Sequence, residues 1–380
     1  MDFELTEELV AIQEMARDYA REVCGPGAAE RDLKETFPTE QVKKAGEAGL
    51  LGLLIPEEYG GNGLGNLALS VALVEINKLD ASVGVTVSVH NSLCCGCINA
   101  WASHELKQKY LPKLATGEWI GAYALSEMGS GSDAGSLQCK AVRDGDDFVL
   151  NGSKAWITTG AQADVIVVFA RTTPDAGNRG VSAFVVERAW PGVTVGKKEQ
   201  KLGIRSSSTV QIHLDGVRVP AGNMLGELDK GFQIALHTLD GGRIGIACQS
   251  LGIMEASLEA SIKYARERTQ FGKPIAKFQA IQWKLAEMET KVQAARLLIR
   301  KAATLKDQRK SHVKAAAVAK LFASRSANWC ASQAVQIHGG AGYCRDFPVE
   351  RFFRDARVTE IYEGTTEVQK IVIARHLLRE

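Results

Sequence analysis

The sequence predicts a multidomain α+β protein with an N-terminal α-helical domain, a central β-barrel domain and a C-terminal four-helix bundle. Apolar residues recur at helical spacing near both ends of the chain, and short β-branched runs separated by turn residues occupy the middle. The chain has 380 residues, of which 45% are hydrophobic and 24% charged, which is enough apolar mass for a large core. We expect the three domains to span residues 1–120, 121–225 and 226–380.

The first segment is predicted to be mainly helical. Apolar residues recur with a helical period at Leu5, Leu9, Ile12, Met15 and Tyr19. A further apolar stretch covers residues 67–79, and residues 106–114 suggest a helix that is interrupted at Pro112.

The second segment has the pattern of short strands joined by turns. Residues 165–169 and 181–186 are rich in β-branched residues, and residues 210–214 alternate between apolar and polar side chains. Asn151-Gly152 follows the apolar run 148–150 and predicts a hairpin turn. Frequent turns between short strands favour a compact barrel or sandwich.

The third segment is predicted to be helical again. Apolar residues follow a helical period over 244–267, 281–305 and 313–337. Several long amphipathic helices in succession predict a bundle.

Composition argues against several classes of protein. The formal net charge is +2 with dispersed basic residues, so we expect no nucleic-acid groove and no polybasic membrane anchor. No apolar run of membrane-spanning length is apparent, and the acidic N-terminus resembles neither a signal peptide nor a transit peptide. We therefore expect a cytoplasmic bacterial protein or, if a presequence was removed, a protein of the mitochondrial matrix.

The cysteines suggest buried thiols rather than a metal site. Eight cysteines in a chain of this size fit a reducing compartment. Cys94, Cys95 and Cys97 are close in sequence, but no second ligand pair follows at zinc-site spacing. We predict no metal.

Five segments carry residues suited to binding or catalysis. In chain order they are 123–133, 154–160, 268–274, 336–343 and 360–367. Glycines let a backbone approach a ligand, Trp156 offers an aromatic face, Arg268 offers a phosphate contact, and Glu363 is a carboxylate on a predicted loop. Each segment also has a structural interpretation, as a linker, a core tryptophan, a helix connection, a helix C-cap or a surface acid. The residue patterns alone leave both interpretations open.

Taken together and in order, the five segments resemble the acyl-CoA dehydrogenase family over essentially the whole chain. The motifs are Ala-Leu-Ser-Glu-Met-Gly-Ser-Gly-Ser-Asp, Trp-Ile-Thr, Arg-Thr-Gln-Phe-Gly-Lys-Pro-Ile, Gln-Ile-His-Gly-Gly-Ala-Gly-Tyr and Ile-Tyr-Glu-Gly-Thr-Thr-Glu. The stretches 238–247 and 354–360 are most similar to short-chain, butyryl-type members. The resemblance implies an FAD-dependent enzyme of fatty-acid β-oxidation that converts an acyl-CoA thioester to the enoyl-CoA.

The resemblance also implies roles for individual residues. Ser126 would lie near the flavin ring, Ser132 near the CoA portion of the substrate, and Thr158 near flavin N5. The implied cofactor contacts are Tyr123, Leu125, Ser126, Gly131, Ser132, Trp156, Ile157, Thr158, Arg268, Phe271, Phe278, Gln279, Gln336, Gly339, Gly340, Thr365 and Glu367. The implied substrate contacts are Asn91, Ser132, Asp240, Arg243, Tyr362 and Gly364.

Glu363 matches the catalytic base of the family. The resemblance implies that it removes the α-proton while the β-hydrogen leaves as hydride to flavin N5. Two branches of the family carry the base instead at the position of Gly242, which has no side chain to serve here.

Partners and substrate follow from the same resemblance. Arg268, Phe278, Gln279 and residues 336–340 match positions near the FAD of an adjoining subunit, which implies a homotetramer. Electron-transferring flavoprotein is the expected electron acceptor. Asn91 is neutral, which argues against a glutaryl-type substrate, and the small residues 94–96 leave room for a branched or alicyclic acyl group. Two alternatives stay open: an acyl-CoA oxidase on the same fold, and a non-catalytic acyl-CoA- or FAD-binding protein.

Overall fold

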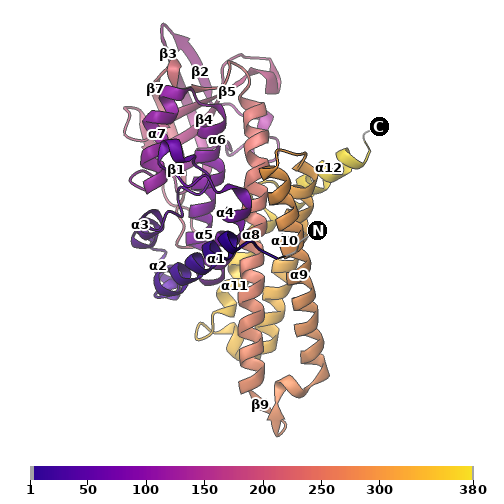
Figure 1. Cartoon of the computed structure of the whole chain (residues 1–380). Helices are drawn as coiled ribbons and strands as arrows, with labels where there is room; N and C mark the ends of the chain where they lie inside the picture. The colour runs from indigo at the N-terminus through magenta and orange to yellow at the C-terminus, as the bar shows by residue number, and fades with distance from the viewer. Residues whose placement is uncertain (1–3, 379–380) are drawn as a thin grey trace.

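The computed structural model describes residues 4–378, and within them the sequence order is a helical region, a β-sheet region and a second helical region. The two helical regions pack against each other through α4 (Gly65–Leu79) and α8 (Gly231–Glu267), and the sheet lies towards one end of the molecule (Figure 1). The N-terminal region is helical, as expected. Its helices are α1 (Glu7–Tyr19), α2 (Ala28–Lys34), α3 (Thr39–Glu47), α4 (Gly65–Leu79), α5 (Ala81–Ser88), α6 (Gly96–Trp101) and α7 (His104–Thr116), with π-helical turns η1 (Ala20–Cys24) and η3 (Val89–Cys95).

Helix α1 shows how local sequence sets these boundaries. The Thr6 hydroxyl accepts a hydrogen bond from the N–H of Leu9 at 3.4 Å, and Glu7 and Glu8 occupy the first turn, where the helix dipole favours acids. Ile12 and Tyr19 are buried, which confirms the predicted apolar face.

Helix α7 differs from the prediction, because it continues through Pro112. The proline removes the hydrogen bond that the carbonyl of Gln108 would receive. Gln108 is exposed, so water can take the place of the missing donor.

The middle region forms one large sheet. Its strands are β1 (Gly121–Ala124), β2 (Lys140–Asp144), β3 (Asp147–Thr158), β4 (Val165–Arg171), β5 (Val181–Glu187), β6 (Val193–Val195), β7 (Thr209–Pro220) and β8 (Met224–Leu225). The strand order is β6-β7-β3-β2-β4-β5-β8, with β1 paired in parallel to β4. Strands 165–169 and 181–186 are thus confirmed. Within residues 4–378 no pairing joins β6 to β8, so the closed barrel is not confirmed.

The hairpin turn predicted at Asn151-Gly152 is wrong. Both residues lie inside β3, and the turn between β2 and β3 falls at Gly145, which has a φ of 63°. Gly152 is needed for a different reason, since a Cβ there would lie 2.7 Å from the Cα of Cys139. A local turn signal was outweighed by pairing along the whole strand.

The C-terminal region contains the three long helices expected from the periodicity. They are α8 (Gly231–Glu267), α9 (Gln279–Asp307) and α10 (Val313–His338), followed by α11 (Val349–Arg357) and α12 (Thr366–Leu377), with a small hairpin of β9 (Thr269–Gln270) and β10 (Lys273–Pro274) between α8 and α9. Each long helix extends the predicted range.

The core explains why sheet and helices stay together. In β4, Val165, Val167 and Phe169 face the helices, whereas Ile166 and Val168 belong to a second cluster on the opposite face. This alternation is the period of a β-strand, and burial on both faces gives a continuous apolar run.

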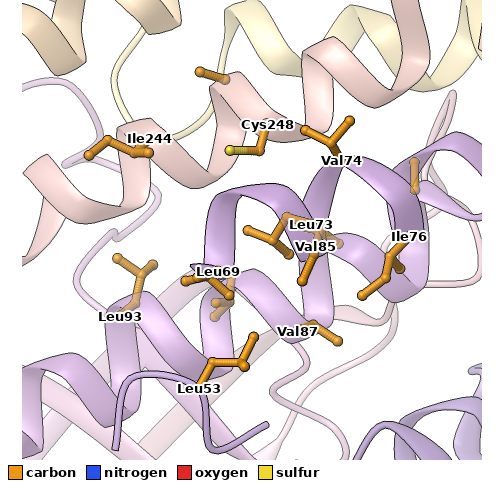
Figure 2. Packing of buried hydrophobic residues seen from close by; sticks show 14 of the residues in the cluster. Leu53, Leu69, Leu73, Val74, Ile76, Val85, Val87, Leu93, Ile244 and Cys248 are labelled. Atoms are coloured by element: carbon orange, nitrogen blue, oxygen red, sulfur yellow. The ribbon is translucent and has the colours of Figure 1, made fainter. Parts of the chain in front are cut away.

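Helix α8 is the central element of the core. Leu73 and Val74 from α4 and Val85 from α5 belong to the same buried cluster as Ile244 and Cys248 of α8, and both α4 and α5 pack against α8 (Figure 2). Because α8 also reaches β5 at its start, it connects the N-terminal helices with the sheet.

One continuous helical stretch, Ala81–Trp101, is apolar and long enough to meet a membrane-span criterion, contrary to the prediction from sequence. It is 94% buried within the protein, as expected of a core helix. Its three small cysteines, Cys94, Cys95 and Cys97, are buried thiols, as predicted.

Candidate functional site

A strained turn before α12 presents Glu363 to the interior. Glu363 has a φ of 50° and Gly364 a φ of 94°. A positive φ is unfavourable for a residue with a side chain, so the backbone at Glu363 is strained, whereas Gly364 adopts its φ readily. The Gly364 carbonyl accepts hydrogen bonds from Lys320 Nζ at 2.7 Å and from Gln369 Nε2 at 2.9 Å. Thr365 caps α12 by accepting from the N–H of Val368 at 3.4 Å. These contacts fix the direction in which the Glu363 side chain leaves the turn.

Glu363 is half-buried as a residue, but its Oε2 atom is shielded from solvent and incompletely hydrogen-bonded. Its Oε2 atom has no hydrogen-bond partner among the described residues. A Cβ at position 242 would lie 1.8 Å from that oxygen and 2.8 Å from Cδ2 of Leu93, so only glycine permits this arrangement. Burial raises the pKa of Glu363 to about 7, against the opposing effect of the positive charges on Lys320 and Arg243. At neutral pH this carboxyl group can both take up and release a proton.

Asp240 and Arg243 lie one turn apart on α8. Arg243 Nη1 donates to Asp240 Oδ1 at 2.5 Å, and both residues are buried. Burial raises the pKa of Asp240, although the Arg243 charge acts in the opposite direction. Arg243 Nε is buried without a partner within residues 4–378, so a donor remains free beside Glu363. The structure thus brings Asp240, Arg243 and Glu363 together around Gly242.

A bulge in β3 projects Trp156 out of the sheet. The register with β7 shifts between Lys154 and Ile157, and Trp156 has a φ of 62° and remains 53% exposed. Bulges of this kind redirect one side chain and are frequent beside functional sites. The N–H of Ala155 donates to the carbonyl of Ser126 at 2.9 Å. The bulge is therefore attached to the loop after β1, where the first predicted segment lies.

Tyr123 connects this part of the sheet with the Glu363 region. It is buried on β1, and burial together with the nearby Glu363 charge raises its pKa. Leu125 is buried as well, Ser126 and Thr158 are half-buried, and Gly131 and Ser132 lie in an exposed loop. These positions form the sheet side of the candidate site.

A buried ion pair beneath the bulge was not anticipated from the sequence. Lys154 Nζ lies 2.8 Å from Glu127 Oε1 and also donates to the Leu125 carbonyl at 3.1 Å. The Glu127 carboxylate further accepts from the N–H groups of Gln138 at 2.6 Å and Cys139 at 3.0 Å. Both charged residues stand inside the predicted segments, but only the fold reveals that they face each other.

Seven predicted cofactor residues lie far from Glu363 in the same chain. Arg268 follows the end of α8, 26 residues beyond Gly242, which corresponds to about 39 Å along the helix. The small hairpin lies at the opposite end of α8 from the large sheet (Figure 1). The seven residues are Arg268, Phe271, Phe278 and Gln279 near this hairpin, and Gln336, Gly339 and Gly340 at the end of α10. One chain does not bring them to its own Glu363.

The side chain of Asn91 forms hydrogen bonds with backbone groups. Its Nδ2 donates to the carbonyls of Leu50 at 2.9 Å and Val87 at 3.0 Å, and its Oδ1 accepts from the N–H of Leu54 at 3.4 Å. The predicted contact of Asn91 with substrate therefore finds no support in its hydrogen bonds.

Tyr362, the neighbour of Glu363, has a polar partner on α8. Its hydroxyl donates to Gln249 Oε1, and Gln249 Nε2 donates to the Ala81 carbonyl at 3.1 Å. Gln249 is buried and lies seven residues after Gly242, on the same face of the helix. The sequence analysis did not single out Gln249, because a buried polar residue in a long helix is visible only when its partners are known.

A cavity of about 450 Å³ opens beside the Lys154–Glu127 pair and is lined in part by Met128, Gly129 and Gln211. None of the residues predicted to bind cofactor or substrate lines it.

Comparison with known proteins places the chain in a family context. It matches profiles for the acyl-CoA dehydrogenase N-terminal domain over residues 6–118, the middle domain over 122–217 and the C-terminal domain over 229–378. It is 51% identical over 376 residues to the mitochondrial short-chain specific acyl-CoA dehydrogenase of Mus musculus, covering 99% of this chain and 91% of that protein.

Two solved structures are similar over their full length. Butyryl-CoA dehydrogenase from Megasphaera elsdenii is 44% identical with a TM-score of 0.98, and both chains are covered completely. A chain in a structure described as the electron transferring flavoprotein of Acidaminococcus fermentans is 46% identical with a TM-score of 0.99, again with complete coverage of both chains.

Proposed function

This chain belongs to the acyl-CoA dehydrogenase family, and we propose that it catalyses the FAD-dependent α,β-dehydrogenation of a short-chain acyl-CoA thioester to the enoyl-CoA. The observation that carries the proposal is the Glu363 carboxyl group. Its Oε2 atom is buried and has no partner among the described residues, its pKa is raised to about 7, and it lies against a glycine. A general base needs a pKa near the working pH and an acceptor atom that can reach the proton.

The residues around the site fit FAD. A flavin presents a flat ring with polar edges and a pyrophosphate. The exposed face of Trp156, the hydroxyls of Ser126 and Thr158, and the open backbone at Gly129 and Gly131 suit these groups. A Cβ at either glycine would meet no atom of residues 4–378 within 4 Å, so the space beside them is open in the described part of the chain. When bound, FAD supplies the acceptor for the β-hydride.

The chain itself provides for removal of the α-proton. Burial brings the pKa of Glu363 close to neutrality, and Oε2 is the atom that would receive the proton. The N–H of Glu363 forms no hydrogen bond within residues 4–378, so it can donate to a thioester carbonyl and stabilise developing negative charge. Arg243 and Lys320 supply positive charge close to the same point.

The preference for a short acyl chain is supported by Gln249. The distance along α8 from Gly242 to Gln249 is about 10 Å. The Tyr362–Gln249–Ala81 hydrogen bonds tie three elements together at that level. We propose that Gln249 closes the acyl cavity and limits its depth.

Several finer features are part of the same proposal. The residues near β9 and at the end of α10 would contact the FAD of an adjoining subunit in a homotetramer, because their own Glu363 is too distant. Electron-transferring flavoprotein is the proposed electron acceptor, and the relative from Acidaminococcus fermentans supports it. The domain limits 1–120, 121–225 and 226–380, the closed barrel and the four-helix bundle remain predictions. Bacterial and mitochondrial relatives both exist, so both predicted locations stand.

The direct test is Glu363→Gln. Butyryl-CoA is added anaerobically to the FAD-loaded protein, and bleaching of the visible flavin band is followed. We expect the variant to retain its flavin band and to lose bleaching, because the amide cannot accept the α-proton. Glu40→Gln, an exposed acid on α3, is the matched control and should bleach like the wild type.

The outcomes separate the alternatives. Bleaching of Glu363→Gln at the wild-type rate would refute the assigned base. A protein that takes up no FAD would favour a function without flavin chemistry, and rapid peroxide formation without an added acceptor would favour an oxidase.

A further inference from the structure

Lys320 is a fully buried lysine beside the Glu363 turn. It lies on α10 with 0% of its surface exposed, and small residues such as Ala317 and Ala323 surround its helix position. Its Nζ donates to the Gly364 carbonyl at 2.7 Å and forms no ion pair within 4 Å among residues 4–378. A buried ammonium group without a direct counter-ion is costly, so its retention at this position calls for a reason.

The charges that face Lys320 come from the elements around the turn. Glu363, Glu360 before it and Glu367 at the start of α12 attract its proton, whereas Arg243 on α8 repels it. Burial lowers the pKa of Lys320 to about 8 despite these acids. Lys320 therefore carries a positive charge at neutral pH, directed at the segment that holds Glu363.

We propose that Lys320 is a positioning residue for the catalytic carboxylate. It fixes the Glu363–Gly364 turn through the Gly364 carbonyl, and its positive charge keeps Glu363 ionised enough to accept a proton at neutral pH. The proposal rests on the role of Glu363 proposed above.

The groups that face Glu363 make Lys320 the main source of this effect. Tyr123 on β1 and the adjacent Tyr362 are uncharged near neutral pH, because burial raises the pKa of both. Arg243 is the other nearby cation, but it is already paired with Asp240. Among the described residues, Lys320 makes the larger contribution to lowering the pKa of Glu363.

Gln369 is an uncharged donor to the Gly364 carbonyl, so it allows the effect of the hydrogen bond on the turn to be separated from the effect of the positive charge. Gln369 donates to the Gly364 carbonyl at 2.9 Å and to the Glu363 carbonyl at 3.4 Å. Gln369 is buried like Lys320 but brings no charge. Loss of Gln369 therefore loosens the turn alone, whereas loss of Lys320 also removes the positive charge.

The experiment measures the pH dependence of anaerobic flavin reduction by butyryl-CoA in the FAD-loaded protein. The wild type, Lys320→Met, Lys320→Arg and Gln369→Leu are compared. A base must be ionised, so the rate falls as pH drops through the pKa of Glu363. Loss of the nearby cation should move this midpoint upward by about one pH unit and lower the rate at pH 7 roughly fivefold.

Lys320→Arg should keep the midpoint near its wild-type value, because the charge remains. Gln369→Leu should lower the rate at every pH and leave the midpoint unchanged. If Lys320→Met does not fold, Lys320→Gln provides the same removal of charge with a polar side chain. An unchanged midpoint in the neutral variant, with Glu363→Gln inactive, would overturn the role of Lys320 alone. Normal bleaching by Glu363→Gln would instead overturn the proposed function.

Discussion

Gln249 shows how much a single buried polar residue can determine. It is buried on α8, and both of its amide atoms are hydrogen-bonded to other elements. Such a residue fixes the separation between α8, the Glu363 turn and α5, and so the room left for an acyl chain.

We expect Gln249→Ala to extend the usable chain length. The truncation removes the link to Tyr362 and opens space two turns beyond Gly242, so flavin reduction by hexanoyl-CoA should rise relative to butyryl-CoA by about tenfold, the effect of roughly 1.4 kcal/mol in a pocket. Gln249→Leu, which keeps the volume, is the control. Equal ratios in Gln249→Ala and the wild type would contradict the role of Gln249 in chain length.

Individual residues were predictable only where a motif named them. The motif resemblance pointed to Glu363 and Trp156, and the structure gives both unusual backbone geometry at the candidate site. Lys320 lies on α10 and Gln369 on α12, whereas Glu363 lies in the turn before α12. Nothing in the sequence around Lys320 or Gln369 indicates that both donate to the Gly364 carbonyl. The predicted substrate contact of Asn91 stays a prediction, and its side chain forms hydrogen bonds with the backbone.

At the scale of elements, periodicity was the reliable signal. Helices α8, α9 and α10 and strands β4 and β5 appear where apolar spacing placed them. The turn at Asn151-Gly152 and the break at Pro112 failed because a local preference of about 1–3 kcal/mol is smaller than the packing of a whole strand or helix. The bulge in β3 leaves no simple signal in the sequence.

The support beneath this bulge can be tested with Lys154→Met. The change leaves the Glu127 carboxylate buried without its counter-ion, so we expect a loss of about 3 kcal/mol in the free energy of unfolding and weaker FAD retention. Thermal unfolding of the FAD-loaded protein and the fraction of bound flavin are the measurements.

The double variant Lys154→Met/Glu127→Gln supplies the control. An uncharged amide can still accept a hydrogen bond from a backbone N–H, so part of the lost stability should return. If the stability losses of the Lys154→Met and Glu127→Gln changes simply add up in the double variant, Lys154 and Glu127 do not act as a pair.

At the scale of the molecule, one junction joins all three regions. Arg354 Nη2 on α11 lies 2.6 Å from Oδ2 of Asp32 in the N-terminal region. The neighbouring Asp355 accepts a hydrogen bond at 2.6 Å from the N–H of Ile204, in the loop before β7. Arg205 in that loop pairs with Glu35 at 2.5 Å. The regions are thus held by charged groups as well as by the apolar core.

Asp355 gives this junction a pH dependence. Burial raises its pKa from 3.8 to about 7, while the bond from Ile204 acts against the shift. A carboxyl whose pKa is raised on folding stabilises the protein fully below its unfolded value and loses that contribution as pH rises through the folded value. The stability of the wild type should therefore fall between about pH 4 and pH 7 through this group.

Asp355→Asn should flatten this dependence, because the amide still accepts from Ile204 but does not ionise. We expect little difference from the wild type at pH 4 and a gain on the order of 2–4 kcal/mol at pH 7. Urea unfolding at several pH values measures it. A stability difference that stays constant across the range would rule out the proposed ionisation of Asp355.

The order of the three regions was predictable because each has its own periodicity, and the family profiles follow the same order. Closure of the sheet into a barrel was not predictable, because strand pairing between distant segments is not encoded in local composition. The distance between the two groups of predicted cofactor residues also became visible only with the full length of α8.

The close approach of Glu363 Oε2 to Gly242 restricts which segment can carry a base at this point. A carboxylate carried by α8 at position 242 and one carried by the turn at position 363 would compete for the same volume. One of the two segments can supply a carboxylate here, but not both at once.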